Sequence, residues 1–261
     1  PLPWNRNGQQ PKWHEREQSY STYGRTMFRP GGQTLVGRWH IDVENTYLLH
    51  EYQLPGLLEL ARITQLPVQR AARRTTGAGV TGMEVAAAYQ KGYLIPRRPK
   101  ESEGWKTALE LYQLDKAGLT FTPYGGIHYE VGVYDFTALY PLIMWRYNIS
   151  PEKVRCDCCP PIPGLGYAIC QKEKGFVPEG MEPLVWKRLR YKEALRNELP
   201  SEKEDLYRCR STANKWLCVV WYGHRRHKHA LWASIEAHEA TAYIGRRALL
   251  RAKDEVERAG F

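Results

Sequence analysis

The residue best suited to chemistry is Asp135, which ends an apolar stretch that is typical of a strand. The sequence there runs Val133-Tyr-Asp-Phe-Thr-Ala-Leu-Tyr-Pro141. A carboxylate at a strand end can bind Mg²⁺ through oxygen, above all where phosphate oxygens complete the coordination shell. Taken alone, the same residue also fits a simple turn-forming aspartate. The sequence therefore offers a metal-binding carboxylate and a structural aspartate as alternatives.

Three cations at helical spacing supply the complementary chemistry. Arg188 and Lys192 lie four residues apart on a helix predicted over 182–197, so they share one face. Lys215 lies on a second helix, predicted over 202–222, and the short connection predicts that the two helices are antiparallel. Cations from two such helices would offset the charge of a polyphosphate and hold it for in-line attack. A solvated basic helix pair is the alternative.

The overall charge points to a polyanionic partner. Lys and Arg total 38 against 28 Asp and Glu, which gives a formal charge of +10. Residues 186–228 alone carry twelve cations against five acids. Such an excess favours nucleic acid, although a basic enzyme of another class has the same composition. The run His224-Arg-Arg-His-Lys-His229 predicts either phosphate contact or an exposed turn.

Composition excludes several classes of protein. The chain is 43% hydrophobic and 25% charged over 261 residues, which are ordinary globular values. No stretch approaches the ~20 apolar residues of a membrane span, and no signal-peptide pattern opens the chain. We therefore expect no membrane association and a cytoplasmic, nucleoid-associated protein. The chain starts without Met, so either the initiator was removed or the chain was cut from a longer one.

Four of the six cysteines are clustered in a Pro- and Gly-rich loop. They are Cys156, Cys158, Cys159 and Cys170. Four thiolates suit a tetrahedral structural Zn²⁺ site, although the spacing is not a Cys-x-x-Cys pair. Reduced thiols in a loop, or one disulfide pair, are the alternatives.

The remaining pattern predicts the elements that must position these residues. We expect an irregular arm over 1–33, a helix from Pro55 to the residue before Pro67, and a glycine-rich break over 77–82. The other expected elements are a helix over 83–90, strands at 119–122 and 129–136, and a helix over 233–258 whose small residues would pack on a sheet.

The string Asp135-Phe-Thr-Ala-Leu-Tyr-Pro-Leu-Ile143 closely resembles the first catalytic motif of family B DNA polymerases, Asp-Phe-x-Ser-Leu-Tyr-Pro-Ser-Ile. The following Asn148-Ile-Ser-Pro-Glu152 is similar to archaeal members. The resemblance implies that Asp135 binds the catalytic Mg²⁺ ions. It also implies that Tyr140 excludes a ribose 2′-hydroxyl, and that a stretch of backbone holds the nucleotide triphosphate. The residues of that stretch are Phe136, Thr137, Ala138 and Leu139.

The resemblance continues in the two basic helices. Lys215-x-x-x-Val-Val-x-Tyr222-Gly is similar to the family motif Lys-x-x-x-Asn-Ser-x-Tyr-Gly, with two valines in place of Asn and Ser. It implies that Lys215 contacts the incoming triphosphate and that Tyr222 lies near the nascent base pair. Arg188 and Lys192 have the spacing of the family's Arg and Lys that grip the triphosphate.

The implied fold is α/β (α+β): an antiparallel palm sheet backed by helices, with a two-helix fingers insertion. The implied division is an N-terminal arm with the end of an exonuclease domain (1–60), a first palm part (61–155), a Cys-containing loop with the fingers (156–228), and a palm helix (229–261). Asp42 stands where the family's third exonuclease motif has its Asp. The earlier exonuclease carboxylates have no room upstream, so we expect no proofreading by this chain alone.

The resemblance predicts a DNA-directed DNA polymerase subunit that adds dNTPs to a primer 3′ end on primer–template DNA. A two-metal polymerase site needs a second carboxylate, which the family supplies in an Asp-Thr-Asp-like hairpin. No Asp-x-Asp follows residue 223. We expect a second polypeptide to supply the remaining palm carboxylates and the thumb. A fragment of a longer chain is the next explanation, and a catalytically inactive homologue that serves as a DNA-binding or assembly subunit is the third.

Overall fold

The computed structural model describes residues 5–9, 12–15, 17–22, 25–97, 105–114, 122, 124–227 and 230–260. The chain divides into two compact units. Unit 1 comprises Pro1–Met83 and Lys187–Leu217, and unit 2 comprises Glu84–Trp186 and Cys218–Phe261. Among the described residues, none of the helices combines the length and the apolar character that a membrane span requires.

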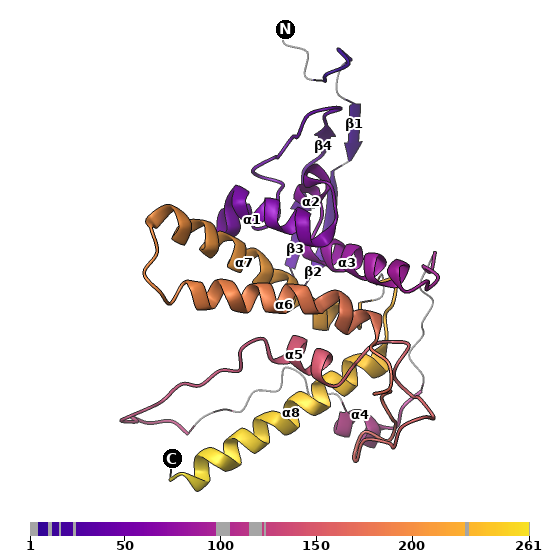
Figure 1. Ribbon diagram of the computed structural model, residues 1–261, viewed down its shortest axis with the longest axis vertical. Helices are drawn as coiled ribbons and strands as arrows, with labels where there is room; N and C mark the ends of the chain where they lie inside the picture. The colour runs from indigo at the N-terminus through magenta and orange to yellow at the C-terminus, as the bar shows by residue number, and fades with distance from the viewer. Residues whose placement is uncertain are drawn as a thin grey trace. The chain divides into compact units, whose positions relative to one another are not determined.

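The described part of the chain is mostly helical (Figure 1). Its helices are α1 (Leu49–Thr64), α2 (Val68–Arg73), α3 (Thr76–Gln90), α4 (Ala108–Leu114), α5 (Leu139–Arg146), α6 (Phe176–Ala194), α7 (Ser201–His224) and α8 (Ile235–Arg258). Its strands are β1 (Lys12–Glu15), β2 (Gln18–Thr22), β3 (Arg25–Arg29) and β4 (Gly32–Thr34). The helices predicted over 182–197, 202–222 and 233–258 are confirmed as α6, α7 and α8, with shifted ends.

The N-terminal arm contains the four strands, so the prediction of an irregular segment over 1–33 is wrong. β2 and β3 pair antiparallel with Gln18 opposite Arg29, and β1 pairs antiparallel with β4. Only two residues separate β2 from β3, which is the length of a tight hairpin connection. Backbone hydrogen bonds pair the two strands. Strands are predicted from hydrophobic patterning, and the mostly polar residues of β2 show little of it.

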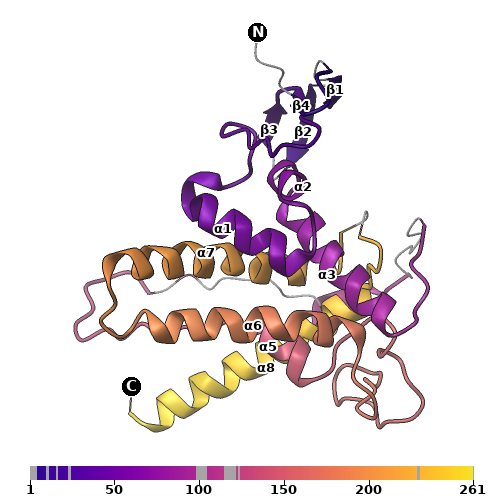
Figure 2. The same ribbon diagram turned by 45° about the horizontal axis from the view of Figure 1, so that its top comes forward.

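Helix α1 lies against α7 within unit 1, as Figures 1 and 2 both show. The regular helix starts near Pro55, as predicted, because a left-handed residue at Gln53 (φ 52°) kinks the first turn. A Cβ atom on Gly56 would lie 2.8 Å from the Cys209 carbonyl oxygen, so this glycine permits the close approach of the two helices. Leu57, buried on the same helix, contributes to the core of unit 1.

The predicted glycine-rich break over 77–82 is wrong, because α3 runs through it without interruption. Its glycines lie where α3 meets the end of α1. A Cβ atom on Gly82 would lie 2.6 Å from the Thr64 carbonyl oxygen, and one on Gly79 would lie 2.9 Å from Thr64 Cγ2. Close helix packing, which leaves no room for a side chain, therefore explains the glycines in this segment.

Within unit 2, α5 packs on α8. Gly245 of α8 allows this, since a Cβ atom there would lie 3.1 Å from Tyr140 Cε1. The small residues of α8, among them the buried Ala237 and Ala240, were expected to face a sheet. In the described residues, α8 instead packs on α5 and α4, and it also contacts the end of α7 through His238.

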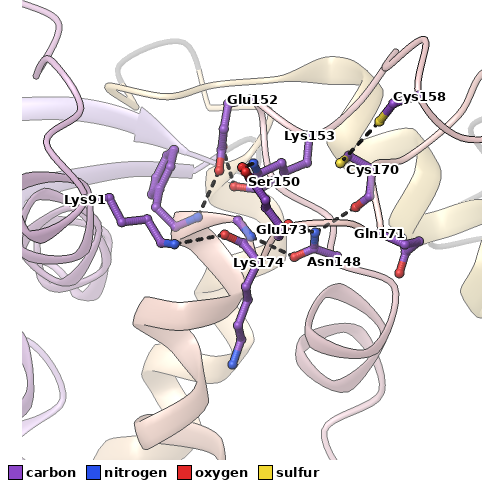
Figure 3. A network of polar contacts seen from close by, with 12 residues as sticks. Lys91, Asn148, Ser150, Glu152, Lys153, Cys158, Cys170, Gln171, Glu173 and Lys174 are labelled. Atoms are coloured by element: carbon purple, nitrogen blue, oxygen red, sulfur yellow. Dashed lines mark hydrogen bonds and ion pairs between the residues drawn. The ribbon is translucent and has the colours of Figure 1, made fainter.

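The segment between α5 and α6 supplies the cap for α6 (Figure 3). Asn148 Nδ2 donates to the carbonyl oxygens of Cys170 and Glu173 at 2.7 and 2.6 Å. The first backbone N–H groups of α6 donate to Glu152 Oε1 (2.9 Å) and Ser150 Oγ (3.2 Å). These residues satisfy N–H groups that a helix start leaves without a partner. The Asn-x-Ser-x-Glu sequence after α5 is therefore a cap for a helix that begins more than twenty residues later.

The predicted palm sheet is not found among the described residues. Positions 129–136 form no strand there, and residues 119–121, in the other predicted strand, lie outside the described residues. The side chains of positions 129–136 are exposed, so no apolar face of this segment is buried within the described part of the chain. A strand forms only when its backbone finds a partner, and this segment has none there.

Substitution of Gly82 by alanine is expected to lower stability by about 1–3 kcal/mol, because the added methyl group must displace backbone. The matched control is Gly223→Ala in α7, where nothing lies within 4 Å of the added atom. That change should be neutral or stabilising by up to ~1 kcal/mol. Urea unfolding of the two variants measures the difference, and equal midpoints would contradict the packing explanation.

Candidate functional site

Asp135 lies in an exposed, extended segment that leads into α5. The chain turns at Ala138, which takes a left-handed conformation (φ 50°, ψ 47°) at the N-cap of α5. No side chain of the described residues caps this helix, so the backbone N–H groups of Leu139 and Tyr140 are available to an acceptor. Within the described residues, the Asp135 carboxylate forms no ion pair. The predicted residues from Asp135 to Tyr140 therefore run from an exposed carboxylate through a turn to the half-buried start of α5.

Three aromatic rings bring distant parts of the sequence together inside unit 2. Tyr140 of α5 stacks on Tyr222 of α7 with ring centroids 4.2 Å apart. Tyr222 stacks in turn on His238 of α8 at 4.1 Å, and its hydroxyl lies 2.9 Å from His238 Nε2. Two residues predicted from separate motifs are thus in direct contact. His238, which the sequence did not single out for this role, completes the stack.

The basic helix pair is held in unit 1 by a buried carboxylate on α1. Glu59 is 1% exposed, and its Oε1 atom forms an ion pair with Lys187 Nζ of α6 at 2.7 Å. The Tyr191 hydroxyl donates to the same oxygen at 3.0 Å, and Arg210 Nε of α7 lies 3.9 Å from the other oxygen. Burial, together with the charge of Glu59, raises the pKa of Tyr191. One carboxylate therefore contacts both helices of the hairpin, closely on α6 and at longer range on α7.

The three predicted cations lie on this hairpin but do not contact Glu59. Arg188 and Lys192 each follow a Glu59-contacting residue of α6 by one position, and Lys215 lies in α7. Lys192 and Lys215 are exposed, and no described residue forms an ion pair with either. The Arg188 Nε atom is buried and has no hydrogen-bond partner among the described residues. The hairpin thus presents cationic groups that are not neutralised within the described part of the chain.

Asp135, Tyr140 and Tyr222 belong to unit 2, whereas Arg188, Lys192 and Lys215 belong to unit 1. That both sets bind the same nucleotide triphosphate stays a prediction.

The run His224–His229 is divided between two environments. His224 and Arg225 are buried, so they neither lie in an exposed turn nor contact an external phosphate, whereas Arg226 and His227 are exposed where the chain leaves α7, as the exposed-turn prediction expects. Arg225 forms an ion pair with Glu84 of α3, also fully buried, and donates to the Trp232 carbonyl at 3.0 Å. Burial lowers the pKa of Arg225, and burial with the charge of His227 lowers that of His224 to about 4. Lys228 and His229 lie outside the described residues.

Asp42 is engaged in structural contacts. It forms an ion pair with Arg73 at 3.1 Å and accepts a hydrogen bond from Asn45 Nδ2 at 2.7 Å. Burial acts to raise the pKa of Asp42, but the hydrogen bonds from Asn45 and the charge of Arg73 outweigh it and hold that pKa below its usual value. This carboxylate therefore has a local structural role in unit 1.

The four clustered cysteines converge, as the zinc prediction requires. The Sγ atoms of Cys156, Cys158, Cys159 and Cys170 all lie within 4.8 Å of one another. All four are free thiols, and no other group of three or more His, Cys, Asp or Glu ligands is found in the described residues. Asp135 belongs to no such group in the described residues, and one carboxylate can supply part of a Mg²⁺ coordination shell but not all of a two-metal site.

Comparison with known proteins gives consistent results. Residues 162–260 match the family model described as DNA polymerase family B. The chain is 30% identical over 206 residues to DNA polymerase 2 of Saccharolobus solfataricus, covering 79% of this chain and 31% of that protein. It is 30% identical over 222 residues to the DNA polymerase of Archaeoglobus fulgidus, covering 84% of this chain and 27% of that protein.

The fold is similar to a solved structure of the family B DNA polymerase from the hyperthermophilic archaeon Pyrobaculum calidifontis. The TM-score is 0.57 at 26% identity, with 81% of this chain and 28% of that chain covered. The chain thus spans about a third or less of the length of the proteins it matches. The family model covers α6, α7 and α8, and Asp135 lies outside its matched range.

Replacement of Glu59 by glutamine is expected to destabilise unit 1 by about 3 kcal/mol, since it leaves Lys187 and Arg210 beside a neutral buried group. Glu204→Gln is the control, because Glu204 pairs with Arg208 on the exposed face of α7 and such pairs contribute under ~0.5 kcal/mol. Thermal unfolding followed by circular dichroism separates the two. Equal losses would show that the buried carboxylate does not hold the hairpin.

Proposed function

Because the chain belongs to DNA polymerase family B, we propose that it contributes the first catalytic carboxylate and the nucleotide-binding helices of a DNA-directed DNA polymerase. In this reaction the primer 3′-hydroxyl attacks the α-phosphorus of a dNTP, a new P–O bond forms, and the bond to the β-phosphate breaks to release pyrophosphate. The observation that carries the proposal is the stack of Tyr140 on Tyr222, because it joins two separate sequence motifs in one place.

Each predicted residue has a role in this proposal. Asp135 binds the catalytic metal, while the turn Phe136–Leu139 accepts the triphosphate at the uncapped start of α5. Tyr140, braced by Tyr222, stands against the sugar of the dNTP, and Tyr222 lies near the nascent base pair. Three cations hold the triphosphate charge and orient it for in-line displacement: Arg188, Lys192 and Lys215.

Magnesium fits the donor that the chain offers. Asp135 provides an exposed carboxylate with no ion-pair partner among the described residues, and Mg²⁺ prefers carboxylate and phosphate oxygens. A bound Mg²⁺ would neutralise charge on the triphosphate and lower the barrier to attack by the primer hydroxyl. The second predicted metal, a structural zinc ion at the cysteine cluster, takes no part in this chemistry.

The proposal includes a second polypeptide that carries the remaining palm carboxylates and the thumb. Its support is the segment 127–136, whose apolar side chains are exposed, with Ile127 83% and Val133 91% accessible. An exposed apolar segment with an unpaired backbone is suited to pair with strands from another chain. The palm sheet expected from the sequence would then be completed between the two polypeptides. In this assignment residues 61–155 and 229–261 belong to the palm, 156–228 hold the Cys-containing loop and the fingers, and 1–60 form the arm.

The alternative is an inactive homologue that binds primer–template DNA as an assembly subunit. The same basic hairpin serves both functions, because phosphate contact needs the cations but no catalytic metal. The single carboxylate at Asp135 is the observation that favours this alternative.

Primer extension tests the choice between the two. The chain is assayed with dNTPs and Mg²⁺, alone and with a separately expressed polypeptide from the neighbouring reading frame that carries an Asp-Thr-Asp segment. We expect extension in the mixture and a loss of at least ~100-fold with Asp135→Asn. The control is Asp254→Asn, an exposed aspartate near the end of α8, which should leave the rate unchanged.

Unchanged extension with Asp135→Asn would refute the catalytic role. No extension in any mixture, with salt-dependent DNA binding retained, would establish the inactive homologue instead.

Sugar discrimination tests the role of Tyr140 separately. Tyr140→Ala removes the ring that Tyr222 braces, so the site gains room for a ribose 2′-hydroxyl. We expect the ratio of ribonucleotide to deoxynucleotide incorporation to rise roughly tenfold or more. Tyr89→Ala, an exposed tyrosine of α3, is the control. A ratio that is the same in both variants would remove Tyr140 from the sugar contact.

A further inference from the structure

The Sγ atoms of the cysteine cluster have the spacing of a metal-bound set. Cys158 Sγ lies 3.5 Å from Cys170 Sγ and 3.8 Å from Cys159 Sγ. Four sulfurs arranged tetrahedrally at ~2.3 Å from a zinc ion are ~3.8 Å from one another. From this geometry we propose that the four cysteines bind one structural Zn²⁺ ion, which fastens the connection between α5 and α6.

The ligand set selects the metal. All four donors are sulfur, and no histidine or carboxylate belongs to the group. Thiolates favour zinc over hard cations such as Mg²⁺ or Ca²⁺, and four protein ligands leave no open position for a substrate. The site is therefore structural, and it is chemically distinct from the carboxylate at Asp135.

The two halves of the cluster differ in how the protein chain holds them. Cys170 follows Ala168 and Ile169, which are buried, and its backbone N–H donates to the Lys153 carbonyl at 2.8 Å. Cys156 and Cys159 are half-buried, as Cys170 is, and Cys158 is exposed. A metal bound by all four would tie the 156–159 segment to Cys170. The Gln171 backbone N–H, which lies 3.5 Å from Cys159 Sγ, already supplies the kind of contact that orients a thiolate ligand.

The connection that the metal would fasten also caps α6 (Figure 3). The Cys170 carbonyl accepts a hydrogen bond from Asn148, whose Oδ1 accepts the Gly175 N–H at 2.8 Å. Ser150 and Glu152, which cap the start of α6, lie between Asn148 and the first cysteine. Asn148 therefore links Cys170 to the residue that precedes α6. A zinc ion bound to Cys170 would thus restrict the contacts that position the first turn of α6.

The surrounding charge suits a four-thiolate zinc centre, which keeps net negative charge. Lys153 and Arg155 precede the first cysteine, and Lys172 and Lys174 follow the last. Acidic residues partly balance them, since Lys153 pairs with Glu173 at 3.2 Å and Arg155 with Glu236 at 3.3 Å. Asp157 lies between the first two cysteines.

Metal analysis of the purified full chain tests the assignment. We expect elemental mass spectrometry to find about one zinc ion per chain, and we expect this zinc to remain bound through gel filtration. A strong chelator should release this zinc and raise the number of thiols that react with a thiol reagent by four. Because this measurement uses the unaltered protein, it does not depend on whether a variant folds.

Two variants locate the metal. Cys170→Ser should lower the zinc content at least tenfold. Cys209→Ala, a change in a buried cysteine of α7 outside the cluster, should leave the zinc content unchanged. Four reactive thiols without zinc, a disulfide in the freshly purified protein, or iron in place of zinc would each overturn the proposal.

Limited trypsin digestion tests what the metal fastens. Arg155 and Lys172 flank the cluster and provide cleavage sites. We expect removal of zinc to increase cleavage at these two sites at least tenfold, with cleavage at Lys253, at the end of α8, as the internal control. An equal cleavage rate with and without zinc would refute the fastening role. None of these measurements depends on polymerase activity, so their results are independent of the proposed function.

Discussion

The carboxylate of Glu59 is the interaction on which the presentation of the basic helices depends. It is buried on α1 and receives Lys187 and Tyr191 from α6 and Arg210 from α7. A buried carboxylate is costly unless it is paired, and the Lys187 and Tyr191 contacts at one oxygen hold α6 to it, while the other oxygen lies 3.9 Å from Arg210 Nε without a hydrogen bond among the described residues. Lys187 and Arg210 are engaged in this contact. Lys192 and Lys215 do not contact Glu59, so they remain available for an external anion.

A second constraint operates in unit 2, where three aromatic rings are stacked. Tyr140, Tyr222 and His238 come from three different helices, and each ring restricts its neighbour. Gly245 provides the space that Tyr140 occupies against α8. The left-handed turn at Ala138 then directs the chain from Asp135 into α5. The position of the predicted metal ligand is thus tied to an aromatic stack by one short turn.

The segment before α5 shows the opposite situation. Its alternating pattern predicts a strand, yet its side chains are exposed and it pairs with no strand in the described residues. A sequence pattern shows which apolar side chains a segment can bury, whereas a strand forms only where a neighbouring strand is present to pair with its backbone. The proposed second polypeptide accounts for both the pattern and the exposure.

The sequence by itself determined three of the long helices and the identity of the candidate residues. Helical spacing located α6, α7 and α8, because a 3.6-residue period is a local property of the chain. The Asp135 string and the cysteine positions carried enough information to name a candidate carboxylate and candidate zinc ligands. These features are readable because residue types and their spacing along the chain are given directly by the sequence.

Only the tertiary structure decided which of these residues are engaged. It showed that the glycines of α3 fit against α1, that Arg225 is buried with Glu84, and that Glu59 and His238 support the candidate site. A single buried glutamate and a lone histidine have no distinctive spacing in a sequence. Their roles arise from contacts between residues far apart in the chain, and such contacts are set by packing rather than by local propensity.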